Sequence, residues 1–67
     1  MEVNAQKIRA AMIDAKLNVR ALSQKSGVSE PAINLMLNRK GRRARLDTVG
    51  KIAAALGVSG MELLKEA

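Results

Sequence analysis

The chain contains no histidine, no cysteine and no aromatic residue. Without cysteine it can form neither a disulfide nor a thiolate metal site, and without histidine the common zinc, iron and copper ligand sets cannot be assembled. The acidic residues are scattered singly along the sequence, so no pair of carboxylates suggests general acid–base catalysis. These absences argue against an enzyme and predict that the chain uses no metal and no other cofactor.

The lack of Phe, Tyr and Trp also removes the platforms on which RNA-binding and single-strand-binding modules stack bases. No apolar run approaches the roughly 20 residues of a membrane-spanning helix, and the first residues lack the basic and apolar regions of a signal peptide. We therefore expect a cytoplasmic protein with no membrane partner. Its 67 residues suffice for a single domain, residues 1–67.

Positive charge is what the chain has in excess. Twelve Lys and Arg against six Asp and Glu give a net charge of +6. Residues 1–45 hold ten basic and three acidic residues, a local charge of +7, whereas residues 46–67 hold two basic and three acidic residues, a local charge of −1. Because a basic surface attracts nucleic acid, we expect the first two-thirds of the chain to carry any such contact.

Composition and periodicity predict an all-α fold, a compact bundle of five short helices. Strong helix formers are abundant, and no stretch alternates in the manner of a strand. Capping residues and apolar spacing place the helices after Asn4, from Val19 to about Ser26, from Ser29 to about Asn38, from Leu46 or Asp47 to Leu56, and after Ser59. The buried stripe of the fourth helix is predicted to be Leu46, Val49, Ile52, Ala53 and Leu56.

Residues 17–38 have the spacing of a helix-turn-helix unit with Gly27-Val28-Ser29 at its turn. Leu22 is expected to point inward before the turn, and Ile33 and Met36 after it. Glycine supplies the left-handed conformation that ends the first helix and lets the second leave at a steep angle. The second helix then protrudes, which is the shape required to enter the major groove of DNA.

Several short motifs extend this pattern along the chain, over about residues 5–65. They are Leu17-Asn18, Leu22, Gln24-Lys25, Gly27-Val28-Ser29, Ile33, Asn38, Lys40, the segment from Ile52 to Ser59, and Leu63-Leu64. In their joint spacing the chain resembles the lambdoid phage repressor and Cro family, within the larger group of five-helix helix-turn-helix regulators. The resemblance implies a transcriptional regulator, repressor or Cro-like, that binds double-stranded operator DNA, usually as a homodimer.

Two positions depart from the family pattern. Val19 stands where such proteins commonly begin the second helix with a DNA-contacting Gln. The positions of a common Arg–Glu pair between the first helix and the end of the third look like Met12 and Leu37. An apolar pair can replace a buried ion pair at little loss of stability.

The candidates to face the bases lie at the start and along the exposed side of the third helix. They are Ser29, Glu30, Pro31, Ala32, Asn34 and Leu35. Glu30 can accept from cytosine N4, Asn34 can pair with an adenine edge, and Leu35 or Ala32 can contact a thymine methyl group. This set predicts modest direct readout, and Leu35 has packing as an alternative role.

Most of the affinity is expected to come from contacts with phosphates. The candidates are Asn18, Arg20, Lys25, Asn38, Arg39, Lys40, Arg42, Arg43 and Arg45. Residues 39–45 carry five charges in seven residues and predict an exposed loop after the third helix. The alternative for this loop is a solvated segment whose charge serves only solubility.

A homodimer would hold its two third helices about 34 Å apart on a palindromic site, and DNA could complete a dimer that is weak alone. Met61 and Leu64 are candidates for either the core or a dimer contact. The alternative function is a protein-interaction or antitoxin-type module on the same fold, with Leu35, Leu37 and Met61 as its contact patch. A membrane-surface role is disfavoured because the helices are short and individually capped.

Overall fold

The computed structural model describes residues 2–38 and 44–64. These residues form four α-helices, α1 (Ala5–Ala15), α2 (Val19–Ser26), α3 (Glu30–Asn38) and α4 (Leu46–Leu56), and one 3₁₀ helix, η1 (Gly60–Leu63). The all-helical prediction is confirmed, but the predicted fifth α-helix is wrong, since it is a four-residue 3₁₀ helix. Leu64 follows η1 in an extended conformation and bridges to Val3, so η1 does not continue past Leu63.

Side-chain caps set the starts of the first two helices. The Asn4 side chain accepts from the backbone N–H of Lys7 at 3.2 Å, and the Asn18 side chain accepts from that of Ala21 at 2.8 Å. Each bond satisfies a backbone donor that the helix itself leaves without a partner. The starts predicted for α1 and α2 from these two asparagines are therefore confirmed.

Three helices end in a residue with left-handed backbone angles. Gly27 after α2 has φ 77° and Gly57 after α4 has φ 73°, as glycine readily allows. The third such residue is Lys16 after α1, with φ 58°, although it carries a Cβ. A non-glycine residue in this region costs roughly 1–2 kcal/mol, so α1 ends at a strained position.

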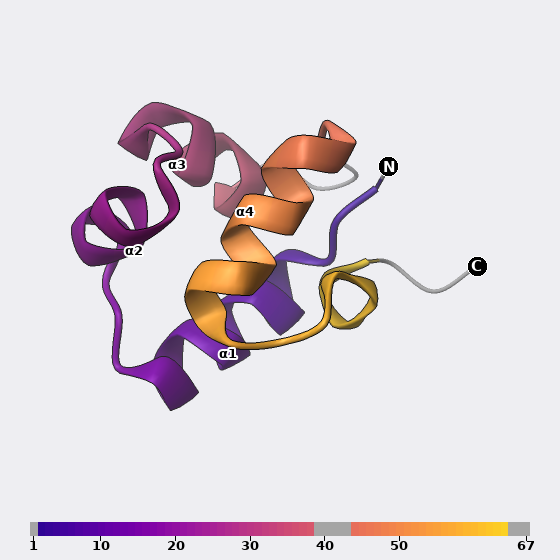
Figure 1. Cartoon of the computed structure of the whole chain (residues 1–67), viewed down its shortest axis with the longest axis horizontal. Helices are drawn as coiled ribbons and strands as arrows, with labels where there is room; N and C mark the ends of the chain where they lie inside the picture. Colours follow the sequence, from indigo (N-terminus) through magenta and orange to yellow (C-terminus); the bar gives the residue numbers. More distant parts are fainter. Residues whose placement is uncertain (1, 39–43, 65–67) are drawn as a thin grey trace.

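The core receives one fully buried aliphatic side chain from every element: Ile8, Leu22, Ile33, Ile52 and Leu63. Within the described residues, no polar or charged residue is buried. Helix α2 packs on α3 and α4, and α1 packs on α3, α4 and η1 (Figure 1). Apolar packing between short helices therefore holds the domain together. None of the described helices is long and apolar enough to cross a bilayer.

The N-terminal segment is part of the core, which the sequence did not predict. Val3 is buried and forms an isolated antiparallel bridge with Leu64. The backbone N–H of Asn4 donates to the carbonyl of Leu63 at 2.8 Å. The segment before α1 and the segment after η1 thus lie side by side, at the right of Figure 1.

Leu46 is 73% exposed, so the prediction that it starts the buried stripe of α4 is wrong. The stripe begins one turn later, at Val49, and continues through Ile52, Ala53 and Leu56 as predicted, with Ala55 added. Leu46 is the first residue of α4, and helical side chains tilt toward the N-terminus. Its side chain is therefore carried beyond the turns that pack on the core.

Candidate nucleic-acid interface

Helix α3 has one buried side and one exposed side. Ile33, Met36 and Leu37 are buried as part of the core. The exposed residues lie at i, i+1, i+4, i+5 and i+8, which is a single face of a helix: Glu30, Pro31, Asn34, Leu35 and Asn38. We call these five residues the α3 outer face. Helix α3 itself lies at the edge of the bundle, next to α2 (Figure 1).

The candidates for base contacts mostly belong to this surface. Glu30, Pro31, Asn34 and Leu35 are on the α3 outer face, and Ser29 is exposed just before it. The Ser29 hydroxyl accepts from the backbone N–H of Ala32 at 3.4 Å, at the start of the helix. Ala32 differs from the other candidates because it is half-buried and packs against the core.

In the turn between α2 and α3, Gly27 has the left-handed backbone conformation that was expected at the end of α2. The backbone N–H of Gly27 donates to the carbonyl of Ser23 at 2.9 Å, and Val28 is buried. The Val28 N–H donates to the Ser26 hydroxyl at 3.1 Å. A Cβ at Gly27 would meet no atom within 4 Å, so the requirement for glycine comes from φ alone.

Helix α2 brings three of the predicted phosphate ligands next to α3. Arg20 and Lys25 are exposed, and Asn18 is exposed at the N-terminal end of the helix. The Oδ1 atom of Asn18 is occupied by the Ala21 N–H. The amide NH₂ of Asn18 is therefore the group that faces outward, and it is a hydrogen-bond donor of the kind that binds phosphate oxygens.

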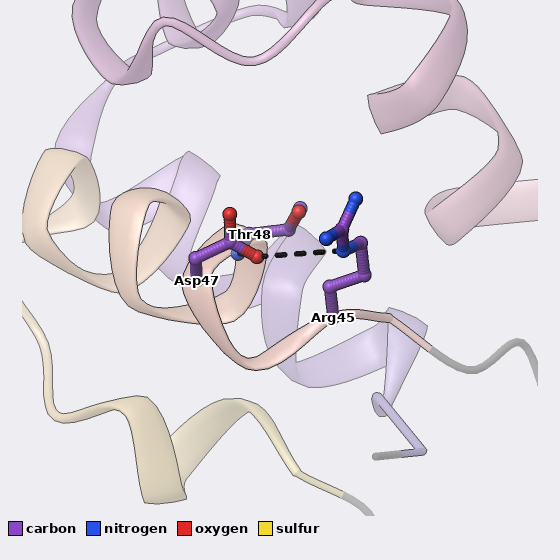
Figure 2. Close-up of polar contacts among 3 residues, drawn as sticks. All are labelled: Arg45, Asp47 and Thr48. Atoms are coloured by element: carbon purple, nitrogen blue, oxygen red, sulfur yellow. Dashed lines mark hydrogen bonds and ion pairs between the residues drawn. The ribbon is translucent and has the colours of Figure 1, made fainter.

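Arg45 lies directly before α4 with its side chain 88% exposed (Figure 2). Its Nε is 3.9 Å from Oδ1 of Asp47, whose side chain is 64% exposed. An ion pair this exposed contributes little stability. Arg45 also occupies the N-cap position of α4 without a side-chain cap. The predicted ligands Arg39, Lys40, Arg42 and Arg43 lie outside the described residues.

The end of α3 is held by a residue that the sequence did not single out. The Nη2 atom of Arg9, on α1, donates to the carbonyl of Leu37 at 2.8 Å and to Oδ1 of Asn38 at 3.3 Å. Met12 and Leu37, the apolar pair noted in the sequence, are both buried. The polar link from α1 to the end of α3 therefore comes from one turn earlier on α1. The sequence signal that could have indicated this link is the position of Arg9, three residues before Met12 on the same helix.

The protein-interaction patch proposed from the sequence does not form as a unit. Leu37 belongs to the core, whereas Leu35 is 42% and Met61 is 80% exposed. The inclusion of Leu37 is therefore wrong, because the side of α3 that carries it packs inward. Among the described residues, no three acidic side chains gather into a group that could hold a metal ion.

Comparison with solved structures supports this geometry. A chain of Streptomyces albus HEPD, solved with 2-hydroxyethylphosphonate and Fe(II), contains a segment that superposes with a TM-score of 0.80 and 30% identity. The match covers 90% of the present chain but 13% of that chain. The restriction-modification controller protein C.AhdI from Aeromonas hydrophila matches with a TM-score of 0.79 and 25% identity over 90% of the present chain and 89% of its own. No curated protein matches the chain.

A family model for the Cro/C1-type helix-turn-helix DNA-binding domain matches residues 7–65, which include all four α-helices except the first two residues of α1. The family model describes a DNA-binding domain, and the similarity to the controller protein extends over most of both chains. The chain belongs to the Cro/C1-type helix-turn-helix DNA-binding domain family.

Proposed function

We propose that the protein is a sequence-specific repressor or Cro-like regulator that places α3 in the major groove of its operator. The observation that carries the proposal is the α3 outer face, an exposed strip with exposed Arg20 and Lys25 on the preceding helix and Arg45 on the following segment. A helix in the major groove has a phosphate strand on each side, where cations on both flanks are needed. The exposed positions agree with this requirement.

Titrations on two duplexes test the proposal, one of random sequence and one selected from a random pool by the protein. Affinity for both should fall with salt, and log K should have a slope of roughly −4 to −6 against log salt if five to seven phosphates are neutralised per subunit. Leu35→Ala should reduce the preference for the selected duplex. Arg20→Ala should weaken both duplexes equally and flatten the slope by about 1. No binding to either duplex at low salt would contradict the proposal.

Base readout is proposed to rest on few residues. Asn34 can bond with an adenine edge, Glu30 can accept from a cytosine amino group, and Leu35 can contact a thymine methyl group, while half-buried Ala32 reaches less far. Each good pair discriminates by roughly 1–3 kcal/mol. In a binding-site selection, Asn34→Ala should therefore lose the adenine preference at one position and keep the others. Unchanged preferences at every position would exclude Asn34 from readout.

We also propose that two copies bind one operator. The domain's longest extent is 29 Å, less than the roughly 34 Å of one duplex turn, so one copy covers about one half-site. Leu46, the first residue of α4, is 73% exposed, and Met61, in η1, is 80% exposed. Large exposed apolar side chains are suited to contact with a second copy.

Sedimentation of the protein alone and on a palindromic duplex tests this contact. Leu46→Glu and Met61→Glu should each convert a two-copy complex into a one-copy complex, since an acidic side chain is poorly tolerated in an apolar contact. Ile13→Glu is the matched control, because Ile13 is 75% exposed on α1. Loss of the two-copy complex with Ile13→Glu but not with the other two would assign the contact to a different face.

A protein-interaction module remains the second candidate. Leu35 favours it, because 42% of this large apolar side chain is exposed on the α3 outer face. Binding experiments with DNA separate the two functions, because a regulator must bind a duplex through this surface, whereas an interaction module need not bind DNA.

A further inference from the structure

We infer that Arg9 is a positioning residue for DNA binding, which acts by fixing the side-chain amide of Asn38 so that its NH₂ group points toward a phosphate. The inference rests on the proposed use of the α3 outer face and adds a residue from outside it. Arg9 is on α1, 28 and 29 positions before its two partners in the sequence. Arg9 therefore makes a long-range contact that connects α1 to α3.

The first bond explains why an arginine is needed at the end of α3. The last carbonyls of a helix have no partner within it, and α3 has no basic residue in its last turn. Arg9 supplies both missing elements, a donor 2.8 Å from the Leu37 carbonyl and a positive charge at the negative end of the helix dipole. Arg9 thereby ties α1 to the last described turn of α3.

The second bond determines how Asn38 is turned. A guanidinium group has only donors, so the atom that Asn38 presents to it must be the amide oxygen. With Oδ1 held at 3.3 Å from Arg9, the NH₂ group of Asn38 is directed to the other side. Asn38 is exposed at the end of the α3 outer face, so this NH₂ group is available to a phosphate.

The same arrangement occurs at Asn18, which strengthens the inference. The Ala21 N–H occupies Oδ1 of Asn18 at 2.8 Å, and this also leaves the NH₂ group outward. Two neutral amides at the ends of α2 and α3 thus present donors rather than acceptors. An asparagine free to rotate would present either group, and fixing it in advance reduces the ordering cost on binding.

The experiment is a double-mutant cycle on DNA affinity with Arg9→Ala, Asn38→Ala and both together. Arg9→Ala should weaken binding about five-fold, the effect of losing one hydrogen bond, and should leave the salt slope unchanged because Arg9 neutralises no phosphate itself. In the Asn38→Ala background, Arg9→Ala should have less than a two-fold effect. Additive losses, or a slope reduced by about 1, would overturn the inference and make Arg9 a direct phosphate ligand.

Two further variants separate the effect of the two hydrogen bonds of Arg9 from the effect of its positive charge. Lys51→Ala, on the exposed side of α4, removes one positive charge and should change affinity less than Arg9→Ala does. Arg9→Lys keeps the charge, but the lysine nitrogen lies one bond closer to the backbone than the Nη2 atom that donates both bonds, so this variant should lose most of the affinity that Arg9→Ala loses. Arg9→Lys with wild-type affinity would show that charge alone suffices and would overturn the inference.

A measurement on the free protein distinguishes this inference from the proposed function. The Asn38 side-chain NH₂ should give a shifted nuclear magnetic resonance pair in the wild type and a pair near the values of a freely rotating amide in Arg9→Lys. If wild-type protein fails to bind any duplex, the proposed function fails whatever this spectrum shows. If it binds DNA but the spectrum of Asn38 is the same in both proteins, only the role of Arg9 fails.

Discussion

Arg45→Ser should stabilise the fold and weaken DNA binding at the same time. Arg45 is at the N-cap of α4 with φ −72° and ψ 151°, angles that suit a capping serine, but its side chain caps nothing. Serine at this position accepts from a first-turn N–H, which contributes about 1 kcal/mol. The lost contact with Asp47 spans 3.9 Å between side chains 88% and 64% exposed, so it contributes at most about 0.5 kcal/mol.

The net gain is therefore about 0.5–1 kcal/mol, which raises the melting temperature by roughly 4 °C in a domain of this size. The loss of one phosphate ligand should weaken binding to any duplex and reduce the salt slope by about 1. Thermal unfolding by circular dichroism and fluorescence anisotropy with labelled DNA measure the two effects. Arg45→Ala is the matched control, because it loses the same charge without gaining a cap.

A serine variant no more stable than the alanine variant would refute the capping part. Wild-type affinity in both variants would refute the phosphate contact. If both effects occur, an uncapped arginine at a helix start is explained as a functional residue retained at a cost to stability.

Other substitutions test individual features of the fold. Lys16→Gly should raise the free energy of unfolding by about 0.5–1 kcal/mol, since it relieves the φ of 58° but adds freedom to the unfolded chain; a lower melting temperature would show that Lys16 is not strained. Gly27→Ala should cost about 1–2 kcal/mol through its φ of 77° alone, and Gly27→Asn should cost less in the same unfolding assay. Val3→Ala should cost about 2 kcal/mol if the N-terminal segment is core, whereas an unchanged denaturation midpoint would place Val3 outside it.

The helix bounds could be predicted because they depend on neighbours in the sequence. Asn18 and Gly27 delimit α2 through bonds to residues three or four positions away. The inward positions of Leu22, Ile33 and Met36 follow from helical periodicity in the same way. Local chemistry was thus sufficient for the helix-turn-helix unit and for the exposed side of α3.

Features that depend on distant partners could not be predicted. The spacing of α1 does not single out Arg9, and its partners are separated from it by α2. Val3 gave no periodic signal, since a single buried residue before a helix has none. Leu46 matched the apolar spacing of α4, but which turns of a helix meet the core depends on where the other elements end.

The bridge between Val3 and Leu64 has a consequence for how the domain can be joined to other polypeptides. Because the two ends of the described fold meet at one edge, the domain can be spliced into a host protein as an insert without stretching either junction. That edge is across the bundle from α2 in Figure 1, so a host attached there leaves the opposite side open to a duplex. The similar segment makes up 13% of the Streptomyces albus chain, so a module of this size also occurs as a small part of a much larger polypeptide.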